Sequence, residues 1–166
     1  MMRVLTVCAM LSAGTAQGDV TARFYESAPK DSFTITNTGP CPLGEVTVTL
    51  DLGASAAGLI FDVTGAGAGV SVFQPLEMVA GQQFLARIPE VKDGDSSISL
   101  PVTGLGTDDS ITFTIDVDDT RGSSATMVSG SEISGAQVVI ESRAGKATAQ
   151  FNTDAQARVP FNACSA

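Results

Sequence analysis

Histidine and tryptophan are absent from this chain of 166 residues, and Tyr25 is its only tyrosine. Without histidine, neither a Ser-His-Asp nor a Cys-His catalytic site can form, and no imidazole is available to bind a metal. The scarcity of large aromatic rings weakens the case for a sugar-binding site. The sequence also has no G-x-S-x-G motif and no phosphate-binding loop. We therefore predict a protein that is not an enzyme.

Positive charge is also scarce, because nine Lys and Arg residues face eighteen Asp and Glu residues, a net charge of −9. Phosphates are bound by clustered Lys and Arg, so nucleic acid and anionic membranes are poor partners for this chain. Divalent cations and basic surfaces match its charge better. Acidity of this size also serves solubility. We expect a protein or a cell surface as the partner.

No apolar run reaches the roughly 20 residues that a membrane-spanning helix needs. The short apolar run from Val4 to Ala13 follows Arg3 and precedes small residues, which is the order of a secretory signal peptide. We predict that residues 1–18 are this signal, cleaved after Gly18 or, alternatively, after Ala16. Without Arg3 the mature net charge is −10, eight minus eighteen. The protein is then exported to the periplasm, the cell surface or the medium.

The chain has three cysteines, and Cys8 lies in the predicted signal peptide. Cys41 and Cys164 remain in the mature protein. Two cysteines in an oxidising compartment predict one disulfide, with two unpaired thiols as the alternative. The bond would tie an early turn to the end of the chain.

Alternation of apolar and polar residues dominates the mature chain and predicts β-strands. The alternating segments are residues 20–25, 33–36, 46–52, 97–100, 111–118, 137–141, 146–151 and 157–161. Gly, Pro, Asn and Asp separate them at short intervals, as in turns. Many short strands at this spacing predict an all-β fold, specifically an antiparallel, immunoglobulin-like β-sandwich. No long segment has helical periodicity, although residues 54–57 and 78–80 could each hold a helical turn.

A soft boundary falls at residues 119–124, which are acidic and then rich in Gly and Ser. About three strands follow it, too few to be stable alone. We therefore expect residues 19–166 to form a single domain, in which the extra C-terminal strands pack onto the first part.

A group of carboxylates, Asp116, Asp118 and Asp119, stands at the end of one alternating segment. Asp116 and Asp118 are expected to project from one face of the strand that buries Ile115 and Val117, with Asp119 in the following turn. Three carboxylates placed in this way suit calcium, the one cofactor that the sequence suggests. The alternative is a solvated strand edge whose charges discourage aggregation. Other acids that could join from neighbouring loops are Glu26, Asp31, Asp62, Asp93 and Asp95.

Several segments are distinctive as sequences. They are residues 25–39 (YESAPKDSFTITNTG), 57–64 (AGLIFDVT), 67–70 (GAGV), 113–120 (FTIDVDDT) and 128–136 (VSGSEISGA). Together they resemble a group of small exported bacterial proteins labelled "aggregation factor core". This resemblance covers nearly the whole mature chain and implies a role in cell aggregation or adhesion, with no catalytic residues to carry over. The segment Phe33–Gly39 also resembles a strand of immunoglobulin-like adhesion domains.

We therefore expect a non-catalytic, secreted or cell-surface β-sandwich that acts in adhesion, aggregation or surface assembly. The alternatives are a calcium-stabilised binding module and a carboxylate-based hydrolase. A cleft holding two carboxylates, one of them in an apolar setting, would favour the hydrolase. An acidic cluster ringed by backbone carbonyls would favour calcium.

Overall fold

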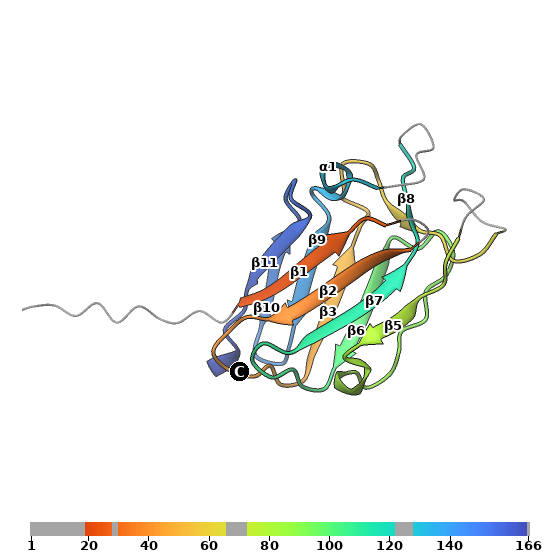
Figure 1. Ribbon diagram of the computed structural model, residues 1–166. Helices are drawn as coiled ribbons and strands as arrows, with labels where there is room; N and C mark the ends of the chain where they lie inside the picture. Colours follow the sequence, from red (N-terminus) through yellow and green to blue (C-terminus); the bar gives the residue numbers. More distant parts are fainter. Residues whose placement is uncertain (1–18, 28–29, 66–72, 122–127, 166) are drawn as a thin grey trace, which may run out of the picture.

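Two antiparallel β-sheets pack face to face in the computed structural model of the protein (Figure 1). The structure describes residues 19–27, 30–65, 73–121 and 128–165, so the predicted signal peptide, residues 1–18, lies outside the described residues. The predicted all-β antiparallel sandwich is confirmed. Its immunoglobulin-like character stays a prediction. None of the described helices has the length and apolar character needed to cross a membrane.

The larger sheet has five strands, and the smaller sheet has four. In spatial order the larger sheet contains β11 (Gln156–Pro160), β1 (Asp19–Tyr25), β2 (Asp31–Asn37), β7 (Ser110–Ile115) and β5 (Glu77–Ala80). The smaller contains β10 (Lys146–Gln150), β9 (Gln137–Glu141), β3 (Val46–Asp51) and β6 (Ser97–Val102). A short separate pair joins β4 (Ile60–Phe61) to β8 (Val117–Asp118). The helical segments are η1 (Gln82–Phe84), α1 (Gly130–Ile133) and η2 (Ala163–Ser165).

The core lies between the two sheets and is filled by the apolar residue of each alternating pair. Phe33 is central to it. Its ring centroid lies 5.0 Å from that of Phe24, 5.4 Å from that of Phe113, and 6.5 Å from those of Phe61 and Phe151. Aromatic pairs in such tilted and edge-to-face arrangements stabilise a core beyond the area that they bury.

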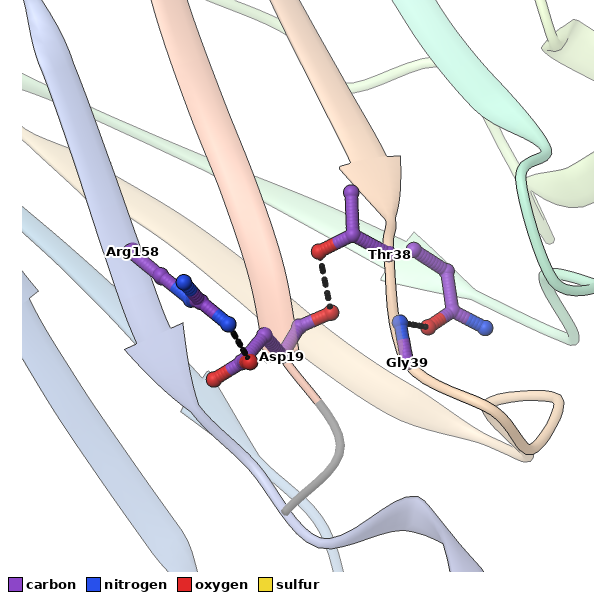
Figure 2. A network of polar contacts seen from close by, with 5 residues as sticks. Asp19, Thr38, Gly39 and Arg158 are labelled. Carbon is purple, nitrogen blue, oxygen red and sulfur yellow. Dashed lines mark hydrogen bonds and ion pairs between the residues drawn. The ribbon is translucent and has the colours of Figure 1, made fainter. Parts of the chain in front are cut away.

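The C-terminal strands belong to both sheets. β9 pairs with β3, and β11 pairs with β1. At the start of β1 the side chain of Arg158 forms an ion pair with Asp19, and the Thr38 hydroxyl donates to the backbone oxygen of Asp19 over 3.0 Å (Figure 2). The last part of the chain is therefore held by the first.

A disulfide joins Cys41 to Cys164, as the cysteine count predicts. Their Cα atoms lie 5.3 Å apart although 123 positions separate them in sequence. The bond lies at the end of the sandwich where the chain ends, away from β8 (Figure 1).

The buried side chain of Asn37 organises the same end of the sandwich. Its amide group donates to the backbone oxygens of Cys41 and Leu105 over 3.0 Å each, and to that of Gly106 over 3.2 Å. Its carbonyl oxygen accepts the Gly39 N–H at 3.1 Å (Figure 2). Asn37 therefore has partners for both ends of its amide, as a buried polar group requires.

Two local predictions need correction. Residues 78–80 form part of strand β5 rather than a helical turn, because they pair with β7 at the sheet edge. Residues 54–57 form turns rather than helix.

Gly81 follows β5 with a left-handed φ of 79°, and a Cβ there would lie 2.4 Å from the Ser110 carbonyl oxygen. Only glycine fits where the chain turns this closely against β7.

Candidate functional site

Buried aspartates gather at the end of the sandwich that lies opposite the disulfide. There β2 begins, β7 ends, and β4 pairs with β8 (Figure 1). The predicted strand through residue 118 is interrupted, because β7 ends at Ile115 and β8 leaves the sheet to pair with β4. Asp116 and Asp118 are 8% and 4% exposed. The interpretation of these two residues as a solvated edge is therefore wrong.

Asp62 follows β4 and is the most isolated member of the cluster. It is 1% exposed, yet neither of its carboxylate oxygens has a hydrogen-bond partner. The carboxylates of Asp93 and Asp118 lie within hydrogen-bonding reach of it, but a carboxylate can donate only when a proton is shared. The backbone is fixed here, because the Asp62 N–H donates to the Asp116 carbonyl over 3.1 Å. One oxygen of the Asp116 carboxylate also lacks a partner.

Asp31, the first residue of β2, is buried but well bonded. One carboxylate oxygen accepts the Ser27 N–H at 3.1 Å, and the other accepts the Val117 N–H at 3.2 Å. This second bond ties the start of β2 to β8. Asp31 therefore has a structural role that Asp62 lacks.

Asp93 approaches the cluster from the segment before β6 and is half-buried. One of its oxygens accepts the N–H groups of Val63 and Thr64 at 2.9 and 3.0 Å. These bonds hold the Asp93 carboxylate against the chain that follows Asp62. Four separate segments thus bring acidic side chains to one end of the sandwich: the start of β2, the end of β4, the segment before β6, and β8 with the residue before it.

The cluster concentrates negative charge where water is excluded. Burial, with smaller contributions from Asp116 and Asp118, raises the pKa of Asp31 to about 7. Burial and the neighbouring Asp93 raise the pKa of Asp62. Burial, followed by the charge of Asp118, raises the pKa of Asp116 to about 6. Each shift reflects a carboxylate that resists ionisation in its present surroundings.

The structure thus brings together only part of the predicted calcium set. Asp116 and Asp118 belong to the cluster, whereas Asp119 follows β8 and is half-buried. Of the further candidates, Glu26 is exposed and the Asp95 carboxylate accepts the Lys92 N–H at 2.8 Å. As the side chains stand, no three acidic or cysteine residues in the described ranges are arranged to hold a metal ion.

A second candidate surface is the outer face of the five-stranded sheet. On β2 and β7 the residues that alternate with the core are all Thr or Ser, and the register aligns them across the two strands. We call this surface, with Thr21 of β1, the hydroxyl face; Arg23 of β1 lies beside it, directly opposite Thr34, and its hydroxyl residues are Thr21, Ser32, Thr34, Thr36, Ser110, Thr112 and Thr114. The hydroxyls of Thr34 and Thr112 are 3.1 Å apart, and those of Thr36 and Ser110 are 2.8 Å apart. Tyr25, 51% exposed, stands at its border.

A surface hollow of about 480 Å³ lies on the smaller sheet, where β3 begins and β6 and β9 end. Two carboxylates, those of Glu45 and Glu141, line it together with Arg143. Both glutamates are exposed, so neither has the apolar setting that the hydrolase alternative requires.

No family model matches the chain, and no curated protein is significantly similar to it. The resemblance to the aggregation factor core proteins stays a prediction.

Proposed function

We propose that this is a non-catalytic, exported β-sandwich protein that acts at the cell surface in adhesion, aggregation or surface assembly. The observation that carries the proposal is the hydroxyl face. Its side chains stand in register on β1, β2 and β7, so they present a broad polar surface rather than a cleft. Each hydroxyl can both donate and accept, which suits many weak bonds to a polar partner.

The rest of the molecule supports a scaffold role. The disulfide and the pairing of β11 with β1 secure both ends of the mature chain, as is useful outside the cell. The edge of β6 is covered, because Ala86 N–H donates to the Pro101 oxygen at 2.8 Å and Thr103 N–H to the Phe84 oxygen at 2.8 Å. The covered edge of β6 offers few free backbone groups to another chain.

A deletion strain tests the role in adhesion. We expect cells without the protein to aggregate less, and the wild-type gene to restore aggregation. Thr34→Glu should fail to restore it, because a charged side chain in the middle of the hydroxyl face breaks the hydroxyl rows. Unchanged aggregation after deletion, with no partner recovered in a pull-down, would argue strongly against the proposal.

The smaller sheet offers a matched control, Thr49→Glu. Thr49 lies on the outer face of β3, and its hydroxyl is 2.9 Å from that of Ser99, much as the Thr34 hydroxyl is 3.1 Å from that of Thr112. Both variants should fold, as checked by circular dichroism and thermal melting. If Thr34→Glu and Thr49→Glu restore aggregation equally, the hydroxyl face is not the contact surface.

A further inference from the structure

The proposed function gives no role to the buried carboxylate of Asp62. Its carboxylate is 1% exposed and has no hydrogen-bond donor at either oxygen. Buried charges in folded proteins are paired or coordinate metals, because an isolated carboxylate loses a large hydration energy on burial. Something absent from the chain itself must therefore satisfy this group, either a proton shared with a neighbouring carboxylate or a cation.

We propose that Asp62, Asp93 and Asp118 bind a divalent cation, preferentially calcium, with Asp116 beside them. This inference is independent of the role in adhesion. The three ligands come from the end of β4, from the segment before β6 and from β8, so one ion would join three parts of the chain. The carboxylates of Asp93 and Asp118 already lie within hydrogen-bonding reach of Asp62.

The donor set determines the kind of ion. Every side chain offered by the cluster is a carboxylate, and hard oxygen ligands select calcium, magnesium or manganese over zinc and copper. Calcium accepts six to eight oxygens in irregular geometry, whereas magnesium requires a near-octahedral shell and retains its waters. Carboxylates brought together from three segments, without octahedral regularity, suit calcium better.

Binding requires the carboxylates to turn. In the conformation of the structure no three of the described acidic or cysteine side chains form a metal site. The backbone around the cluster is already held, by the bond from the Asp62 N–H to the Asp116 carbonyl and by the two N–H groups that bond Asp93. Binding would therefore require the Asp62 carboxylate to turn toward those of Asp93 and Asp118, while these backbone bonds persist.

Equilibrium dialysis of the chelator-treated mature protein against radioactive calcium, at constant sodium chloride, tests the proposal directly. We expect one bound calcium per chain. At a free calcium concentration about a hundred times the dissociation constant, the melting temperature should rise by roughly 5–10 °C. Magnesium should raise it less. Sodium chloride at equal ionic strength is the control for general screening of the acidic chain.

Two substitutions localise the ion. Asp62→Asn should weaken calcium binding at least tenfold and remove the calcium-specific rise in melting temperature. Asp154→Asn removes the same charge from an exposed turn before β11 and should leave both unchanged. If Asp62→Asn does not fold, Asp118→Asn replaces it, and dialysis of the wild-type protein still decides.

Shared protons are the competing explanation, and the same experiments separate the two. A wild-type protein that binds no calcium in dialysis, and whose melting temperature responds equally to calcium chloride and sodium chloride, would overturn the proposal. Equal calcium binding by the wild type and Asp62→Asn would also overturn it, because the ion would then lie elsewhere.

Discussion

Asn37 and Asp62 are each 1% exposed, and they lie at opposite ends of the sandwich. The Asn37 amide donates to three backbone carbonyls and accepts one N–H. The Asp62 carboxylate, equally buried, has no donor at either oxygen. Burial alone therefore does not distinguish a structural polar group from a candidate ligand, whereas the hydrogen bonds do.

The two ends differ in what they contribute. At the disulfide end, Asn37 and the Cys41–Cys164 bond join distant segments through contacts that are complete within the chain. At the aspartate end, β2, β4 and β8 bring together carboxylates that repel one another. Buried polar groups without partners are rare in folded proteins, and each calls for an explanation. We expect the disulfide end to stabilise the fold and the aspartate end to respond to a ligand.

The largest effect should follow loss of the disulfide. The double substitution Cys41→Ser and Cys164→Ser opens a loop between residues 123 positions apart. The chain-entropy model gives a loss of about 5 kcal/mol in the free energy of unfolding for a loop of this length. Urea denaturation measures it. Calcium binding should persist in the fraction of the double variant that stays folded. A loss below about 1 kcal/mol in the free energy of unfolding would show that the disulfide end does not depend on its covalent bond.

Removal of the Asn37 side chain should have the next largest effect. Asn37→Ala leaves the buried Gly39 N–H without its acceptor and opens a small cavity. We expect a loss of about 2–3 kcal/mol, because a buried group that loses its partner retains its desolvation cost. Urea denaturation compares this loss with that of Asp62→Ala. The Asp62→Ala loss should be smaller, because the Asp62 carboxylate accepts no hydrogen bond from a donor. Equal losses in the two variants would contradict the distinction between the ends.

A gain in stability is expected from Asp62→Asn in calcium-free buffer. The neutral amide removes one charge from the cluster and can donate to the carboxylates of Asp93 and Asp118. We expect the free energy of unfolding at neutral pH to rise by about 1–2 kcal/mol. Asp154→Asn, an exposed position, should change it by less than about 0.5 kcal/mol. If Asp62→Asn is less stable than the wild type without calcium, repulsion is not what distinguishes this end.

The strands could be predicted because their signal is local. Alternation in segments such as residues 46–52 and 111–115 follows from burial of one face of each strand, and the structure has strands there. Phe113, in the middle of one such segment, is fully buried. Helix α1 is too short to show helical periodicity, but it has another local signal, since Ser129 and Glu132 form a capping box at its start.

Only some of the residues in the aspartate cluster could be predicted from the sequence. Asp116 and Asp118 are two positions apart in sequence and stand out as a pair. Their inward position depends on the pairing of β4 with β8, two residues on each side, which leaves no periodicity to detect. The sequence offers Asp62 and Asp93 only among five acids that could join from neighbouring loops, because their proximity is a property of the tertiary structure.

A pH dependence of stability is also expected, and it should come from the aspartate end. The pKa values of Asp31 and Asp116, about 7 and about 6, lie above the ordinary value of 3.8. The folded protein therefore retains protons that the unfolded chain has already released. This contribution to stability is complete below the ordinary pKa and is lost as the pH rises through the folded pKa values. In calcium-free buffer we expect the free energy of unfolding to fall by about 2 kcal/mol between pH 5 and pH 6, with Asp31 and Asp116 each contributing about half. Urea denaturation at constant ionic strength measures this slope.

Saturating calcium should reduce the slope of stability against pH, since a bound cation favours the ionised carboxylates. Asn37→Ala should leave the slope unchanged, because the amide does not titrate. If stability instead rises over this interval in the calcium-free protein, the carboxylates are ionised in the folded state, and the contrast between the two ends is not electrostatic.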